Sequence, residues 1–240
     1  MPTTDEPVLL RLRVSSREGM SDELIARVND ICDQAEDAVG EAVVIAELIA
    51  AGLDPANWPG SVGVNLVGKW ERALRRLERS PVVIIAYAEG LCVGAAAETL
   101  LVADYRIVTG GFVFQLSHDR TRLWPGMALH RLVAQSGFSR ARRLALFGQG
   151  LTAATARDLN FVDEVHPAGA DLAAMADSAA TRWARLSGAE LAIRRRLLSD
   201  ALVSDFEDAL GGHLAACDRM LRQTGAEADK RVRTASADVS

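Results

Sequence analysis

A buried apolar segment that runs into a helix of very small residues constrains the fold of this chain most strongly. Residues 82–88 read VVIIAYA, which is long and apolar enough for a fully buried strand. Gly90 follows the strand, and the segment GAAAE from Gly94 to Glu98 predicts the start of a helix. A buried strand that leads into a helix indicates an α/β fold.

The rest of the chain repeats this alternation of strands and helices at intervals of roughly 30 to 40 residues, which favours parallel pairing of the strands. From residue 169 onward the pattern is almost entirely helical. We therefore expect an α/β core over residues 1–168, a helical oligomerisation region over residues 169–224 and a flexible tail over residues 225–240.

Composition excludes several classes of function. The formal net charge is −5, which argues against a dedicated nucleic-acid-binding protein. Three widely spaced cysteines fit neither a disulfide framework nor a metal site and suggest a reducing compartment. The polar start MPTTDEP does not resemble a signal peptide, and the longest apolar run contains three carboxylates, which argues against a membrane span. We expect a soluble, cytoplasmic protein.

The residues around Glu98 predict chemistry as well as structure. Small residues at a helix start leave backbone N–H groups uncovered, and such groups can hold a developing negative charge. Because helical side chains lean back toward the N-terminus, the Glu98 carboxyl group should overlook the amide of Ala95. The alternative is that Glu98 is an ordinary solvated charge on an Ala-rich helix.

Four segments in order resemble the enoyl-CoA hydratase/isomerase (crotonase) superfamily. They read EGLCVGAAAE, LLVADYRIV, FVFQLSHDRTRLWPGMALHRL and GQGLTAATARDLNFVDEVHP. The resemblance covers roughly residues 81–167 and is weaker on either side. One such segment would carry little weight, but four at matching spacing are fairly specific.

The resemblance implies a spiral of β-β-α turns, a helical trimerisation region and a homotrimer or hexamer. It implies coenzyme A thioesters as substrates, with no metal and no other cofactor. Two backbone amides of the family hold an enolate, and Ala95 aligns with the residue that supplies one of them. Glu98 aligns with the first catalytic glutamate of the hydratases. The remaining expected substrate-binding residues are Gly94, Trp124, Pro125 and Gly126.

The chain departs from the family pattern at two places. The second catalytic glutamate is replaced by His118, which we expect to be the second acid/base group, with neighbouring Asp119 as the alternative. The family's A-G-x-D loop is replaced by AAGLDPANWPGSVG, so the second amide is expected from a residue between Trp58 and Gly63. Structural roles are expected for Asp104, in the turn after the helix, and for Cys92, in the core.

The segments KWERALRRLER and LWPGMALHRL resemble one subfamily of these proteins. Its members are accessory dehydratases of 3,5-dihydroxyphenylglycine biosynthesis, which act with a type III polyketide synthase. The resemblance implies a dehydratase or hydratase that acts on a polyketide-derived CoA thioester. Two alternatives stay open: a non-catalytic accessory subunit that binds the synthase or its product, and an enoyl-CoA isomerase.

Overall fold

The structure is a computed structural model that describes residues 6–38, 41–50, 58–116, 118–119 and 122–237. For residues 118–119, 122–123 and 226–237 it describes the backbone alone. The chain divides into two compact units, residues 1–191 and residues 192–240. Each unit is described by itself.

A five-stranded sheet forms the centre of the first unit, and its neighbouring strands are all parallel. The strand order is β1-β2-β3-β5-β10. The strands are β1 (Val8–Ser15), β2 (Ala42–Ile49), β3 (Val83–Ala88), β5 (Tyr105–Thr109) and β10 (Glu164–His166). The predicted α/β class and the predicted parallel pairing are both confirmed.

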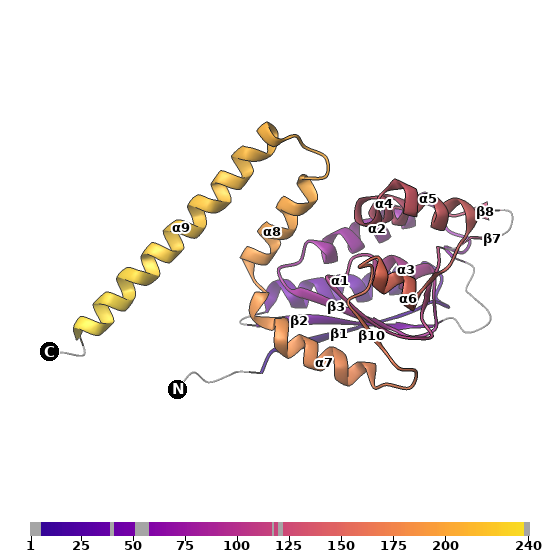
Figure 1. The fold of residues 1–240 in the computed structure, drawn as a ribbon, viewed down its shortest axis with the longest axis horizontal. Helices are drawn as coiled ribbons and strands as arrows, with labels where there is room; N and C mark the ends of the chain where they lie inside the picture. The colour runs from indigo at the N-terminus through magenta and orange to yellow at the C-terminus, as the bar shows by residue number, and fades with distance from the viewer. Residues whose placement is uncertain (1–5, 39–40, 51–57, 117, 120–121, 238–240) are drawn as a thin grey trace. The chain divides into compact units, whose positions relative to one another are not determined.

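Helices cover both faces of this sheet (Figure 1). On one face lie α1 (Asp22–Asp37), α2 (Val64–Glu78) and α3 (Gly94–Leu100), and on the other lies α7 (Leu172–Trp183). Side chains of β2 alternate accordingly: Val44 packs in the core under α1 to α3, and Val43 packs in the core under α7. A sheet covered on both faces explains why its central strands read as continuous apolar runs.

Two-residue strands complete the strand-strand-helix turns of the core. β4 (Leu91–Cys92) lies between β3 and α3, and it pairs with β6 (Val113–Phe114), which pairs in turn with β9 (Leu151–Thr152). A separate pair consists of β7 (His118–Asp119) and β8 (Arg122–Leu123). Strands of two residues are too short to show a periodic pattern in the sequence.

Three more helices lie beyond these short strands, namely α4 (Ala128–Ser136), α5 (Phe138–Phe147) and α6 (Ala153–Asp158). The hydroxyl of Thr152 caps α6 by accepting the N–H of Thr155. The carboxyl group of Asp104 accepts the N–H of Ile84 at 2.8 Å, and the Asp104 N–H donates to the Ile84 carbonyl. The predicted structural role of Asp104 is therefore confirmed.

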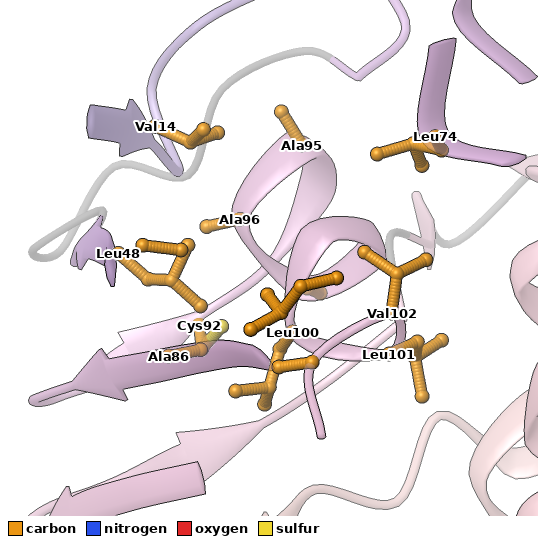
Figure 2. Close-up of a cluster of buried hydrophobic side chains, with 14 of the residues drawn as sticks. Val14, Leu48, Leu74, Ala86, Cys92, Ala95, Ala96, Leu100, Leu101 and Val102 are labelled. Atoms are coloured by element: carbon orange, nitrogen blue, oxygen red, sulfur yellow. The ribbon is translucent and has the colours of Figure 1, made fainter. Parts of the chain in front are cut away.

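Helix α3 is buried along its whole length in the main core. Figure 2 shows Ala96 and Leu100 of α3 in the same apolar cluster as Leu48 of β2 and Ala86 of β3. Cys92 lies in this cluster too, and burial raises the pKa of its thiol. The small side chains at the start of α3 let the helix approach the sheet closely.

The end of the first unit differs from the expected boundary at residue 168. The Ala-rich face of α7 packs against β2, β3 and β5, so this helix belongs to the core. The second unit holds most of α8 (Ala189–Asp200) and all of α9 (Phe206–Ala237). Helix α9 continues past Gly225, where the sequence analysis placed a tail, since Ala, Glu, Lys and Arg in that segment favour helix. Within the described residues, no helix is both long enough and apolar enough to span a membrane.

Candidate active site

The site is organised around the first turn of α3. Val93 is the N-cap residue, and its N–H donates to the Ser16 hydroxyl at 3.2 Å, which ties the helix start to the end of β1. Gly94 has φ of +58°, and a Cβ atom there would lie 3.3 Å from Cβ of Trp58. Both the backbone conformation and the close approach of Trp58 favour glycine at this position.

Glu98 lies one turn into α3, and its carboxyl group is enclosed by indole rings. The residue is 2% exposed, so it is not the solvated charge of the alternative interpretation. Oε2 accepts the Nε1–H of Trp70 at 2.6 Å. Oε1 accepts the Nε1–H of Trp58 at 3.0 Å and that of Trp124 at 3.2 Å. Three indole donors from three different segments therefore converge on one carboxyl group.

Burial raises the pKa of Glu98 to about 7, because the charged form loses contact with water. The hydrogen bonds from Trp70 and Trp58 act in the opposite direction by favouring the carboxylate. Two charged groups act at longer range, with Glu71 raising the pKa and Arg131 lowering it. A carboxyl group that changes charge near neutral pH suits general acid–base catalysis.

Ala95 is fully buried at the second position of the helix. The first four N–H groups of a helix have no partner within the helix. Among the described residues, no hydrogen-bond acceptor is found for the Ala95 amide. The arrangement brings this amide and the Glu98 carboxyl group onto one helical turn, as predicted.

Trp124 and Gly126 also lie beside the Glu98 carboxyl group. A Cβ atom at Gly126 would lie 2.4 Å from Nε1 of Trp124 and 3.1 Å from Oε1 of Glu98. Only glycine therefore lets the Trp124 ring reach the carboxyl group. Pro125 is exposed. Trp124 and Gly126 are brought to the predicted site as neighbours of Glu98.

A buried ion pair fixes the helices around these indoles. Arg131 of α4 donates to Glu71 of α2 at 3.0 Å, and Arg131 is 6% exposed. The other oxygen of Glu71 accepts the N–H of Met127 at the start of α4. This pair holds α2, which carries Trp70, against the loop and helix that follow Trp124.

Two predicted features fall outside what the structure describes. The side chains of His118 and Asp119 are not among the described parts, so the second acid/base group stays a prediction. Residues 51–57 of the unusual loop also lie outside the described residues. The described part of that loop contributes Trp58, which lies inside the range expected to supply the second amide.

Sequence reasoning missed the roles of Trp58 and Trp70. Trp70 lies on the buried face of α2, where its ring belongs to the core. The available signal was chemical, because a buried indole N–H generally needs an acceptor. The two rings meet edge to face with centroids 5.6 Å apart, which fixes both donors together.

A polar cavity of about 310 Å³ lies elsewhere in the first unit. It is lined by parts of β5, α4, α5 and β9 and by the segment that follows α6, including Arg106, Gln135 and Arg140. None of the predicted site residues lines it. Among the described residues, no group of three or more potential metal ligands is found.

Comparison with known proteins defines the class of protein. The family model for enoyl-CoA hydratase/isomerase matches residues 17–237. The chain belongs to this family, and the crotonase-like fold expected from the sequence is confirmed.

Particular relatives agree with this assignment. An enoyl-CoA hydratase of Amycolatopsis orientalis is 41% identical over 89% of this chain and 96% of its own length. An enoyl-CoA hydratase structure from Polaromonas sp. JS666 superposes with a TM-score of 0.76 at 20% identity, covering 92% of this chain and 91% of that one. A Thermobifida fusca structure, described as a putative enoyl-CoA hydratase in complex with acetoacetyl-CoA, has a TM-score of 0.72 at 20% identity, covering 92% and 94%.

Proposed function

We propose that this protein is an acyl-CoA dehydratase or hydratase in which Glu98 moves the proton and Ala95 stabilises the enolate. The observation that carries the proposal is the Glu98 carboxyl group, buried three residues after Ala95 and held by three indole donors. Its pKa of about 7 lets it both accept and donate a proton near neutral pH. Membership of the enoyl-CoA hydratase/isomerase family supports the same reaction class.

A coenzyme A thioester is the proposed substrate, and coenzyme A enters only as part of it. The Thermobifida fusca protein, which shares this fold, was solved in complex with acetoacetyl-CoA. The thioester carbonyl would point at the Ala95 amide, and a second backbone amide from the segment after β2 would complete the oxyanion hole. No metal or redox cofactor is needed for this chemistry.

In the dehydration direction, the proton on the carbon next to the thioester carbonyl leaves and its electron pair moves onto the carbonyl oxygen. The Ala95 N–H donates to that oxygen as negative charge develops there. The electron pair then returns to form the carbon–carbon double bond, and the hydroxyl group on the next carbon departs with a proton as water. Glu98 handles one of the two proton transfers, and His118 is proposed to assist with the other.

The aromatic surroundings of Glu98 favour a flat, conjugated acyl group. Trp58 and Trp124 present apolar rings beside the carboxyl group, and such rings stack favourably on planar groups. A cyclised polyketide that loses water to become an aromatic ring has this shape. We therefore propose that the protein acts with a type III polyketide synthase in the formation of 3,5-dihydroxyphenylacetyl-CoA, as a homotrimer or hexamer.

Reconstitution tests this proposal. A type III polyketide synthase supplied with malonyl-CoA is incubated with the wild-type protein, and 3,5-dihydroxyphenylacetyl-CoA is measured by mass spectrometry. Glu98→Gln should lower the product rate by about 100-fold or more, as expected for loss of a general acid–base group. The matched control is Glu89→Gln, which removes an exposed carboxyl group between β3 and β4 and should leave the rate unchanged.

A non-catalytic accessory role is the second candidate function. The enclosure of Glu98 by Trp58 and Trp124 favours it, because a substrate must displace or slide past an indole to reach the carboxyl group. In that case Glu98→Gln would stimulate the synthase as well as the wild-type protein does. An isomerase would instead move a double bond within the thioester without gain or loss of water.

A further inference from the structure

The three indoles around Glu98 do more than fill the core. We propose that Trp58, Trp70 and Trp124 are positioning residues that hold the Glu98 carboxyl group in one orientation and favour its ionised form. The catalytic consequence of this arrangement rests on the proposed function, but the orientation and the ionisation of the carboxyl group do not.

The donors are distributed unevenly over the two carboxyl oxygens. Oε1 accepts two N–H groups, from Trp58 and Trp124, and Oε2 accepts one, from Trp70. A carboxylate oxygen offers about two acceptor positions. Among the described residues, the occupied positions leave one on Oε2, and a second opens on Oε1 if Trp124 moves aside.

The donors are also held in place by different means. Trp70 is fully buried in the core and lies edge to face with Trp58. Trp124 is only half buried and makes the longest of the three hydrogen bonds, at 3.2 Å. The arrangement assigns a fixed role to Trp58 and Trp70, and it leaves Trp124 as the indole that can yield to a substrate.

Other charged groups near the site must be separated from the effect of the indoles. Glu71 of α2 and Arg131 of α4 act on Glu98 through space and in opposite directions. They form an ion pair with each other, so they move together if either helix shifts. A variant that removes an indole N–H leaves this ion pair intact.

The first test uses the unmodified protein and needs no substrate. The chain has four tryptophans, so its proton–nitrogen NMR spectrum holds four indole resonances. The fourth, Trp183, is the last residue of α7 and packs, partly buried, against the core on the other face of the sheet. We expect the resonances of Trp58, Trp70 and Trp124 to titrate with one shared midpoint near pH 7, and that of Trp183 to stay unchanged.

Glu98→Gln is the control that assigns the titration of the indole resonances to Glu98, because the shared titration should disappear in this variant. Titration of the three indoles at different midpoints, or its persistence in Glu98→Gln, would overturn the proposal. The NMR titration does not depend on catalytic turnover, because it uses no substrate. A shared titration in a protein without activity would instead support the positioning role of the three indoles and count against the proposed function.

The second test removes one donor at a time. Trp70→Phe keeps an aromatic ring but loses the N–H, so the Glu98 midpoint should rise by about one pH unit. The limb of the kcat/KM pH profile that reports Glu98 should move in the same direction and by a similar amount. Trp58→Phe provides a second route if Trp70→Phe does not fold, and Trp183→Phe is the control in which neither quantity should move. A Trp70→Phe or Trp58→Phe protein that folds with an unchanged titration midpoint for Glu98 would refute the positioning role of the indoles.

Discussion

The Nε1 atom of Trp70 and the Oε2 atom of Glu98 lie 2.6 Å apart, which joins the middle of α2 to the first turn of α3. It is the shortest of the three indole hydrogen bonds to this carboxyl group. Both residues are buried, so this contact belongs to the core as well as to the site. The stability of the fold and the protonation of Glu98 are therefore linked.

This linkage predicts that the contribution of Glu98 to the free energy of unfolding depends on pH. Its pKa is about 7 in the folded protein, against 4.5 for a glutamate in water, so between these pH values the native state retains a proton that the unfolded state has lost. The free energy of unfolding of wild-type protein, minus that of Glu98→Gln, should fall by about 3 kcal/mol as pH rises from 4.5 to 7. It should level off above pH 7. Urea titrations at a series of pH values measure this difference, and a flat or rising difference would contradict the assignment.

Replacing Gly126 by alanine should displace Trp124. The new Cβ would lie 2.4 Å from the indole Nε1, which is closer than any tolerable contact. We expect a loss of about 1–3 kcal/mol in the free energy of unfolding, the usual range for overpacking, and a changed Trp124 indole resonance. Gly110→Ala is the control, because its Cβ would meet its nearest neighbour at 4.0 Å. Equal effects of the two substitutions would show that Trp124 is not held against Gly126.

The ion pair between Glu71 and Arg131 should show strong coupling. Arg131→Met leaves the Glu71 carboxylate in a largely enclosed place without its cation, which should cost about 3 kcal/mol of the free energy of unfolding. Combining it with Glu71→Gln should recover a large part of that loss, since the uncompensated charge is then removed. Chemical denaturation of both single variants and the double variant measures the coupling. Additive losses would mean that the two side chains do not interact.

Thiol labelling tests the packing around α3. Cys32 and Cys92 are buried, and burial raises the pKa of Cys32 to about 11, whereas Cys217 on α9 is exposed. Iodoacetamide at pH 8 should modify Cys217 quickly and leave the other two thiols unmodified until the protein unfolds. Mass spectrometry of the digested protein identifies the labelled cysteine. Rapid labelling of Cys92 in native protein would contradict the described core.

The sequence allowed much of the core to be predicted because long apolar runs and capped helices carry clear periodicity. The strand ending at Ala88 and the helix beginning at Gly94 are both found where they were expected. The two-residue strands and the inclusion of α7 in the core were not predicted. Pairing in such short strands, and the packing of one helix face against a sheet, depend on contacts between residues far apart in the chain.

The candidate site was predicted in part for the same reason. Ala95 and Glu98 lie on one helical turn, so local geometry was enough to place them together. Trp58 and Trp70 reach Glu98 from 40 and 28 residues away, and nothing in their local sequence identifies the carboxyl group as their acceptor. Their convergence appears only once the fold brings α2 and the segment before it over α3.

The most direct test of the account is the rate of water addition to a series of enoyl-CoA thioesters, from crotonyl-CoA to the planar cinnamoyl-CoA. For the best of these substrates, wild-type protein and Glu89→Gln should show equal rates, and Glu98→Gln should be slower by about 100-fold or more. A Glu98→Gln protein as active as the wild type would contradict the central role of Glu98.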